Sequence, residues 1–242
     1  ITLEAVLKDS PQHYTEAHMV SEKDINSYFM ITTNQSWADF GDIWWKFYEP
    51  KLKVTPTIQK LADKITSKIP KNAKDHDKAA AALLYNWVAG NIHYIAVYLS
   101  DASNYTPNAP DVILKRGYGD CKDFSTLLVV LLKAANIHAN PVAINWSNQF
   151  AKYPVATPDS FNHAIVYIPK WHMFLNPTNT FAPFGSLSTT LTNKPALIIK
   201  PNSELLMTPK NNAAKNRGHF KSEVDLSDDG DLKGTEQDMY YG

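Results

Sequence analysis

Apolar residues recur at intervals of three and four between residues 55 and 90, which is the spacing of one face of an α-helix. The first stripe lies between a start signal at Thr55-Pro56 and a stop signal at Pro70, and it consists of Ile58, Leu61, Ala62, Ile65 and Ile69. The second ends before a predicted C-cap at Gly90-Asn91, and it consists of Ala80, Leu83, Leu84, Trp87 and Val88. The pattern predicts two amphipathic helices, followed by an extended segment at 94–99 and a loop at 104–110.

A third helical pattern, from about Lys122 to Ala135, is apolar on nearly every side. Such a helix is typical of the centre of a fold, because no face of it is suited to water. Asp120 is the predicted N-cap, Asp123 is expected to answer it in a capping box, and Asn136 is the predicted C-cap. This arrangement places Cys121 at the first position of the helix.

After the third helix the period of the pattern changes to two, which is the period of a β-strand. One alternating run covers residues 138–146 and a second covers residues 161–168. The turn signal Pro169-Lys170 before residues 171–175 predicts a hairpin, and residues 196–200 are predicted to join the same sheet. Helices followed by antiparallel strands indicate an α+β fold.

The two ends of the chain differ in composition from this core. Residues 1–50 contain a strand-like segment at 28–33 and an aromatic cluster at 37–47, whose helical spacing favours a short packed helix over an aromatic ligand platform. A polar linker begins near Asn211 and leads into alternating segments around a turn at 227–231. We therefore expect the end of a preceding β-rich domain and an aromatic linker helix at 1–50. A core domain is expected at 51–212, and a linker with the start of a following β domain at 213–242.

Composition narrows the class of protein. Hydrophobic residues make up 44% and charged residues 20% of the 242 residues, which is typical of a soluble globular protein. Lys and Arg together number 24, and Asp and Glu together also number 24, so the formal net charge is zero. The overall charge therefore does not favour nucleic acid or an anionic membrane as a partner. No apolar run approaches the roughly 20 residues that span a bilayer, and no signal peptide is visible. Because the chain begins at Ile1 without methionine, we interpret it as a fragment or a processed form, and its localisation stays open.

Cys121 is the only cysteine, which excludes an internal disulfide and a thiolate-rich metal site. A lone cysteine is more often a small buried hydrophobic residue than a nucleophile. At a helix N-terminus, however, the unpaired N–H groups and the macrodipole are expected to stabilise the thiolate, with Lys122 as a minor positive neighbour. A neighbouring imidazolium would lower the thiol pKa further. The position of Cys121 therefore favours a nucleophilic thiol.

His163 is the candidate base, if the strand that carries it crosses the tip of the third helix. Asn176 lies at the end of the next strand of the predicted hairpin, where its side-chain oxygen is able to accept from the imidazole and hold the tautomer that faces sulfur. The alternatives are a structural histidine at 163 and a turn at Asn176-Pro177. The other histidines share no ligand spacing, and neither a phosphate-binding loop nor a serine elbow is present, so we expect no metal and no cofactor.

With these residues assembled, the chain resembles the transglutaminase-like superfamily of papain-type thiol enzymes. The resemblance is closest to the bacterial branch, in which one β-rich domain precedes the core and another follows it. It covers about residues 55–210, and it is carried by the segments Tyr105–Leu114, Gly119–Asp123, Leu131–Ala139, Phe161–Ile165 and Phe174–Thr178. The most specific part is the pair Gly-Asp-Cys-Lys-Asp and Phe-Asn-His-Ala in this order.

The resemblance implies a papain-like core in which a cysteine at the start of a central helix packs on an antiparallel sheet. It implies Cys121 as the nucleophile, His163 as the base and Asn176 at a third position that is usually an aspartate in the family. Asparagine keeps the orienting hydrogen bond but removes a charge that would stabilise the imidazolium. Family members are often exported in Gram-negative bacteria, so a periplasmic location is implied by the resemblance only.

We therefore expect a thiol-dependent acyl-transfer enzyme that attacks an amide of a protein or peptide substrate and forms a thioester. Hydrolysis by a protease, amidase or deamidase is favoured over cross-linking, because nothing in the sequence marks an amine site. The oxyanion would be held by the Cys121 N–H and an unidentified second donor, at a helix tip supported by Asp120, Lys122 and Asp123. The alternative is a catalytically weak or inactive module of the same fold that serves in protein binding or assembly. Neither nucleic-acid binding nor membrane insertion is expected.

Overall fold

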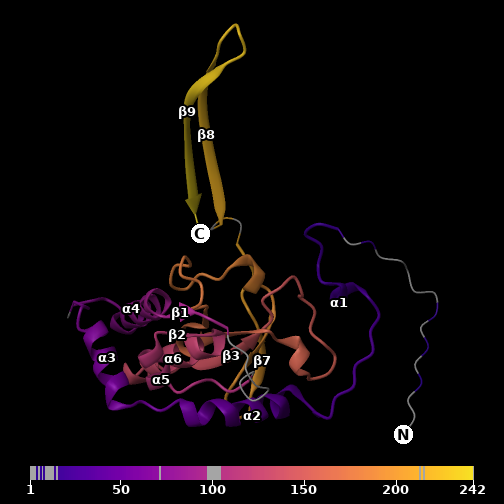
Figure 1. Ribbon diagram of the computed structural model, residues 1–242, viewed down its shortest axis with the longest axis vertical. Helices are drawn as coiled ribbons and strands as arrows, with labels where there is room; N and C mark the ends of the chain where they lie inside the picture. The colour runs from indigo at the N-terminus through magenta and orange to yellow at the C-terminus, as the bar shows by residue number, and fades with distance from the viewer. Residues whose placement is uncertain are drawn as a thin grey trace. The chain divides into compact units, whose positions relative to one another are not determined.

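The computed structural model describes residues 4, 6, 8, 14, 16–70, 72–96, 105–212, 214 and 216–241, and the chain divides into two compact units at residues 1–208 and 209–242. The helices of the first unit are α1 (Glu22–Ile25), α2 (Trp37–Tyr48), α3 (Pro56–Thr66), α4 (His76–Asn91), α5 (Pro110–Arg116) and α6 (Cys121–Ala134). Its strands are β1 (His93–Tyr94), β2 (Tyr118–Gly119), β3 (Asn140–Ile144), β4 (His163–Ile168), β5 (Met173–Leu175), β6 (Pro195–Ile198) and β7 (Glu204–Met207). Figure 1 shows α3, α4, α5 and α6 gathered on one side of the β3–β7 sheet, which confirms the α+β prediction.

Helices α3 and α4 form where the apolar stripes predict them. The side chains of Thr55 and Asp75 cap them by accepting from a backbone N–H of the first turn, at 3.3 and 3.0 Å. The cap predicted at Gly90-Asn91 is wrong, because α4 runs through both residues and has Ile92 at its C-cap. Within the described part of the chain, no helix has the length and apolarity that crossing a membrane requires.

The central helix is α6, and all of its residues except Cys121 and Lys133 are buried. It packs on α3, α4 and α5 and on strands β3 and β4, which explains why it is apolar on nearly every side. Asp120 is its N-cap, as predicted, whereas its C-cap is Ala135. The predicted C-cap, Asn136, lies one residue further on with a φ of 58°, a left-handed conformation that asparagine tolerates well.

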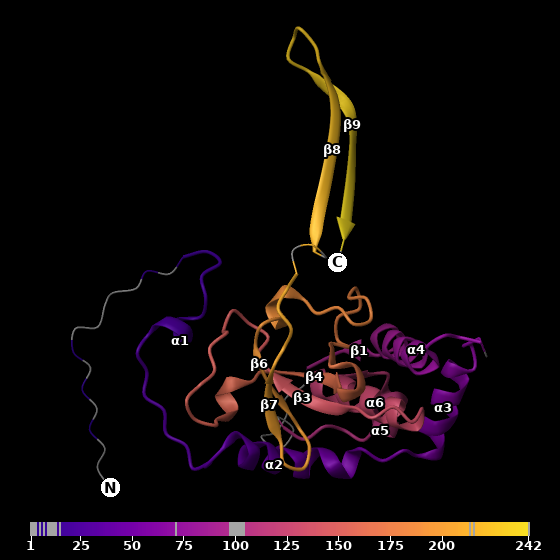
Figure 2. The ribbon, with the colours of Figure 1, turned by 180° about the vertical axis from the view of Figure 1, so that it is seen from behind.

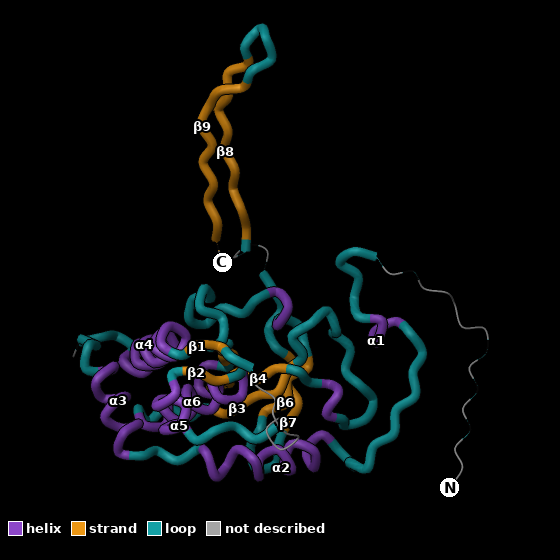
Figure 3. Tube along the Cα trace, in the orientation of Figure 1, coloured by secondary structure: helices purple, strands orange, loops and turns teal. Residues whose placement is uncertain are grey.

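The sheet has the strand order β5-β4-β3-β6-β7, and every neighbouring pair is antiparallel. Strands β3, β4, β6 and β7 are labelled in Figure 2. The predicted hairpin is the β4–β5 pair, and the strand predicted at 196–200 is β6. All residues of β3 and β4 are buried, because one face of the sheet packs on α6 and a second apolar cluster, which includes Phe174 and Leu191, covers the other. Long loops connect β3 to β4 and β5 to β6 (Figure 3).

The aromatic cluster near the N-terminus forms α2, as its helical spacing predicts. Ser36 caps the helix by accepting from the Asp39 N–H at 3.1 Å. Helix α2 packs closely on the turn before β7, because a Cβ added to Gly41 would lie 2.1 Å from the Cβ of Ser203. The strand-like pattern at 28–33 is wrong as a strand prediction, since these residues form no regular element. Six residues do not hold a strand without a neighbour to pair with.

The second unit is a hairpin of β8 (Arg217–Leu226) and β9 (Leu232–Tyr241), antiparallel and exposed along both strands. Its turn lies at 227–231, where the sequence predicts one. That this hairpin opens a following β domain, and that residues 1–50 end a preceding one, stay predictions. Of the extended segment predicted at 94–99, residue 94 lies in β1 and residues 97–99 fall outside the described residues, as does residue 104 of the predicted loop.

Candidate active site

Two glycines bring Cys121 to the tip of α6. Helix α5 ends at Arg116 with Gly117 as its C-cap, whose φ of 71° suits glycine, and β2 then pairs in parallel with β1. A Cβ added to Gly119 would lie 2.6 Å from the Cβ of Asp123, so glycine lets the first turn of α6 close onto β2. Cys121 is therefore the first residue of α6, at the position that the sequence predicts, and its side chain is partly exposed.

Three charged residues at this helix tip are almost fully buried. Asp120 accepts from the backbone N–H groups of Lys122 at 3.1 Å and Asp123 at 3.4 Å, and it forms an ion pair with the Lys122 ammonium group. The capping box predicted for Asp123 is wrong. Its carboxylate accepts instead from the backbone N–H of Asn108 at 2.7 Å and from the side-chain amide at 3.0 Å. Asp123 thus ties the loop before α5 to the helix tip.

The sheet holds the imidazole of His163 against Asn176. His163 begins β4, Asn176 follows β5, and the pairing of these strands brings Nε2 within 3.1 Å of Oδ1. We assign Nε2 as the protonated nitrogen because an amide oxygen only accepts hydrogen bonds, and Nδ1 is then the basic nitrogen. Both side chains are buried, at 6% and 1% exposure. The structure therefore brings together the two residues that the hairpin was predicted to align.

Thr178 holds the side chain of Asn176 in this orientation. Its hydroxyl donates to Oδ1 of Asn176 at 2.8 Å, and its backbone N–H donates to the same oxygen at 3.4 Å. The backbone carbonyl of Asn176 accepts from the Tyr85 hydroxyl at 3.1 Å. Nδ2 of Asn176, by contrast, is buried without a hydrogen-bond partner. Hydrogen bonds therefore hold both the side-chain oxygen and the backbone oxygen of Asn176, whereas its Nδ2 donor stays unsatisfied.

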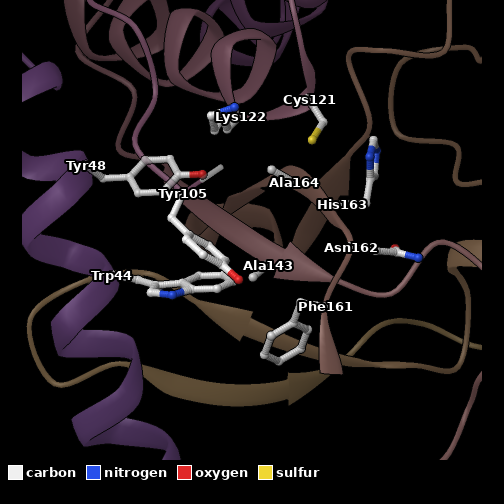
Figure 4. Close-up of a pocket in the computed structure, with 10 residues that line it drawn as sticks. All are labelled: Trp44, Tyr48, Tyr105, Cys121, Lys122, Ala143, Phe161, Asn162, His163 and Ala164. Carbon is white, nitrogen blue, oxygen red and sulfur yellow. The ribbon is translucent and has the colours of Figure 1, made fainter. Parts of the chain in front are cut away.

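Cys121 and His163 open into one cavity of about 460 Å³. Figure 4 shows the sulfur of Cys121 and the ring of His163 facing the same space, with the phenol of Tyr48 on the opposite side of Cys121 from the ring. The cavity is completed by residues of α2, of the loop before α5 and of the sheet. A carbonyl group placed at the sulfur would thus lie between the imidazole and the phenol.

Three rings, Trp44, Tyr105 and Phe161, form an aromatic wall across the cavity from Cys121 (Figure 4). The ring centroid of Trp44 lies 5.6 Å from that of Tyr105 and 6.0 Å from that of Phe161. The rings come from α2, from the loop before α5 and from the segment before β4. Trp44 therefore lies on the packed helix that its spacing predicts and also lines the cavity.

Trp146 covers one face of the His163 ring, with the two centroids 4.4 Å apart and the planes inclined by 53°. The indole Nε1–H donates to Oγ1 of Thr190 at 2.8 Å, and the backbone N–H of Trp146 donates to Oδ1 of Asn162 at 2.6 Å. The segment between β5 and β6 thus holds the indole, and the residue before β4 holds the backbone of Trp146. Its contact with His163 removes water from the ring and disfavours the charged imidazolium.

Burial raises the pKa of the Cys121 thiol, and the Asp120 carboxylate raises it further. A backbone hydrogen bond from Ala164 and the charge of Lys122 act in the opposite direction but do not outweigh these two causes. The expectation that the helix tip lowers the thiol pKa is therefore wrong. The reason is that desolvation and a neighbouring anion outweigh the backbone hydrogen bonds, including the one from Lys122 in the first turn of α6.

Burial also lowers the pKa of His163 to about 4, although the hydrogen bond to Asn176 and the charge of Asp120 favour the protonated form. At neutral pH the pair is thus a neutral thiol beside a neutral imidazole. The imidazolium that was expected to lower the thiol pKa is absent from this state. Such a pair works by proton transfer from sulfur to nitrogen when a substrate is attacked.

Sequence reasoning did not assign a role to Tyr48, Trp146 or Thr178. Tyr48 ends α2, and its periodicity indicates only a buried position. Trp146 belongs to the alternating run 138–146, which continues past the end of β3 at residue 144. Thr178 could have been found from its place two residues after Asn176, because hydroxyl and amide side chains bond locally in such turns.

Comparison with known proteins agrees with this fold. The family model described as the transglutaminase-like superfamily matches residues 59–175, which include Cys121 and His163 and end one residue before Asn176. A solved structure of a putative protease from Parabacteroides distasonis has a TM-score of 0.53 and 14% identity, over 81% of this chain and 38% of that chain. A putative cysteine protease from Cytophaga hutchinsonii has a TM-score of 0.35 and 21% identity, over 55% of this chain and 42% of that chain. No curated protein matches the chain.

The chain spans less than half the length of either solved structure. The likeness to the Parabacteroides structure extends to the fold, and that fold is the helix-on-sheet arrangement in which α6 presents Cys121. The matched residues contain the two segments, Gly119–Asp123 and Phe161–Ala164, that carry the resemblance most specifically. The core of this chain, residues 59–175, thus belongs to the transglutaminase-like superfamily.

Proposed function

We propose that the cavity catalyses thiol-dependent acyl transfer from an amide of a protein or peptide, with Cys121 as nucleophile, His163 as base and Asn176 as the residue that orients His163. The observation that carries the proposal is the 3.1 Å hydrogen bond between His163 and Asn176, beside a thiol that opens into the same cavity. This bond directs the proton to Nε2 and leaves Nδ1 as the base. The name of the Parabacteroides structure, a putative protease, is consistent with this reaction class.

In the first step the thiol proton of Cys121 passes to Nδ1 of His163 while the sulfur attacks the carbonyl carbon. The C–S bond forms as the carbonyl electron pair moves onto oxygen, where the backbone N–H of Cys121, in the first turn of α6, is a donor. The C–N bond then breaks, and His163 returns the proton to the leaving amine. The product of this half-reaction is a thioester on Cys121.

Water completes the reaction in the hydrolytic direction. His163 accepts a proton from water as the water oxygen attacks the thioester. The C–S bond then breaks to release the acid, and His163 returns the proton to the sulfur of Cys121. Both attacks require a neutral imidazole, and a pKa of about 4 keeps His163 neutral at physiological pH. Hydrolysis is favoured over transfer to an amine, because the described residues that line the cavity include a lysine but no carboxylate to bind a cationic acceptor.

The aromatic wall indicates the kind of acyl group. Trp44, Tyr105 and Phe161 offer apolar surface to a side chain next to the reacting carbonyl, and burying such surface contributes about 25 cal/mol for each Å². A charged side chain in the same place would lose its hydration without a partner. The proposed substrate is thus a protein or peptide with an apolar or aromatic residue on the acyl side of the amide.

Release of p-nitrophenol from activated esters tests the acyl-enzyme and the wall together. N-acetyl-phenylalanine p-nitrophenyl ester is expected to give a burst equal to the enzyme concentration, with the acyl mass on Cys121. The corresponding aspartate ester is expected to acylate the enzyme about tenfold more slowly. Tyr105→Ala, at a residue that is 44% exposed, should narrow this difference. Phe220→Ala, at an exposed aromatic residue of β8, should leave it unchanged.

Two results would contradict this reading. A burst that survives in Cys121→Ala would place the acylation elsewhere on the protein. Equal acylation rates for the phenylalanine and aspartate esters in the wild type would remove the wall as a determinant of the acyl group, while leaving the role of Cys121 intact.

Replacing Asn176 with aspartate adds the charge that the family usually has at this position. We expect the variant to fold and to keep or increase the reactivity of Cys121. Because an anion beside the imidazole favours its protonated form, the pKa of His163 should rise from about 4. The acidic limb of the alkylation profile with iodoacetamide should then move up by about 1–2 pH units.

Asn91→Asp is the matched control, because it adds the same charge at an exposed position at the end of α4 and should leave the acidic limb in place. Circular dichroism and thermal melting monitor the fold of both variants. A collapse of stability in Asn176→Asp alone would identify Asn176 as a structural turn residue and would contradict its orienting role.

A further inference from the structure

The proposed reaction needs a second donor for the oxyanion, and helix α2 is the element that reaches this part of the cavity. Helix α2 precedes the residues that match the family model, yet its last residue, Tyr48, lines the same cavity as Cys121. Tyr48 is 3% exposed, so its ring is fixed by packing. Figure 4 shows the phenol approaching from the side of Cys121 that lies opposite His163.

We propose that the hydroxyl of Tyr48 is the second oxyanion donor, in partnership with the backbone N–H of Cys121. This inference rests on the proposed acyl transfer. When the sulfur attacks, the leaving nitrogen must lie near His163 to receive its proton, so the carbonyl oxygen points away from the imidazole. The space on that side of the sulfur is where the phenol lies, and a preorganised donor there stabilises the developing charge.

An oxyanion donor must keep its proton, and the surroundings of Tyr48 ensure this. Burial raises the pKa of Tyr48 well above its usual value, and the charges of Cys121, Asp120 and Asp123 raise it further. The influence of Cys121 also means that the hydroxyl lies within electrostatic reach of the sulfur. Ser125 acts in the opposite direction and lowers the pKa of Tyr48, but it does not outweigh these causes.

Two other polar side chains near this part of the cavity are less suited to this role. The ammonium group of Lys122 is paired with Asp120. The indole N–H of Trp146 donates to Thr190 at 2.8 Å, and the ring lies over His163, on the side of the base. Position and protonation therefore favour Tyr48 over these two side chains.

The test compares two reactions of Cys121 in the variant Tyr48→Phe, which keeps the ring and removes the hydroxyl. Acylation by N-acetyl-phenylalanine p-nitrophenyl ester passes through an oxyanion, and its burst rate constant should fall about 100-fold with little change in KM. Alkylation by iodoacetamide displaces iodide at a saturated carbon and forms no oxyanion. Its rate should stay within about twofold of the wild-type rate.

Tyr167→Phe is the matched control, because it removes the hydroxyl of another buried tyrosine on β4, which interacts with His172 rather than with the cavity. Both reactions should keep their wild-type rates in this variant. If alkylation and acylation fall equally in Tyr48→Phe, the residue acts through the fold and the inference is overturned. It is likewise overturned if acylation in Tyr48→Phe is unchanged.

The same measurements distinguish failure of the proposed acyl transfer from failure of the proposed role of Tyr48. Failure of the acyl transfer would appear as alkylation of wild-type Cys121 that does not depend on His163, together with no burst. In that case neither the wild type nor Tyr48→Phe would show the acylation on which the oxyanion comparison depends, and both proposals would be rejected. Burst acylation and His163-dependent alkylation in the wild type, with unchanged acylation in Tyr48→Phe, would instead reject only the role of Tyr48.

Discussion

At pH 6, replacing His163 with alanine is expected to slow alkylation of Cys121 by iodoacetamide about 100- to 1,000-fold. In the wild type the neutral imidazole accepts the thiol proton during attack, so the reaction needs no prior ionisation. The logarithm of the rate should therefore be nearly independent of pH between about 5 and 8, and should decline only as His163 is protonated near its pKa of about 4.

In His163→Ala only the ionised fraction of the thiol reacts, and burial raises the pKa of Cys121. The rate should then rise about tenfold for each pH unit over the same range. His138→Ala is the matched control, because His138 lies outside the cavity on the exposed connection between α6 and β3. A wild-type profile with the slope of an ordinary thiol, unaffected by His163→Ala, would contradict catalysis and would favour the alternative of a binding or assembly module.

The free energy of unfolding is expected to fall by about 3 kcal/mol between pH 7 and pH 4 because of His163 alone. The pKa of this residue is about 4 in the folded protein, and an unfolded histidine titrates near pH 6.5. Between these two values the unfolded chain binds the proton and the folded protein does not, so acid favours unfolding. Full stability from this group is present above about pH 6.5 and is lost as the pH falls toward 4.

Urea denaturation of the wild type and of His163→Gln at pH 7, 5.5 and 4 measures this effect. The carboxylates, Asp120 among them, contribute equally to both proteins, and Cys121 and Lys122 still line the cavity in the variant. The difference between the two pH dependences therefore isolates the imidazole, and His163→Gln should lack about 3 kcal/mol of the acid destabilisation. Parallel curves would mean that His163 is hydrated in the folded protein, which would contradict its burial at 6% exposure.

The local elements of the core could be predicted because their causes are local. Apolar residues at helical spacing, with Thr55 and Asp120 as caps, were sufficient for α3 and α6, and alternation was sufficient for β3 and β4. The same approach failed at residues 28–33, where a strand-like segment has no partner strand. It also misplaced the end of α4, because helix ends depend on contacts that the periodicity does not encode.

Part of the candidate site could be predicted because its order along the chain is distinctive. Cys121 stands at a capped helix start, and His163 and Asn176 stand at aligned ends of one hairpin. The partners of Asp123 could not be predicted from local spacing. A capping box is the nearest local option, whereas Asn108 reaches Asp123 only because the loop before α5 folds over the helix tip.

The sequence by itself determined that a cysteine lies at the start of a central helix, with His163 on a strand that follows and Asn176 at the end of the next strand. Only the tertiary structure decided the protonation of this pair, since a pKa depends on how much water and which charges surround the group. Burial and Asp120 outweigh the backbone hydrogen bonds and the Lys122 charge at Cys121, and Trp146 covers His163. The tertiary structure alone also brought Tyr48 to the sulfur, because helix packing joins residues that no local pattern connects.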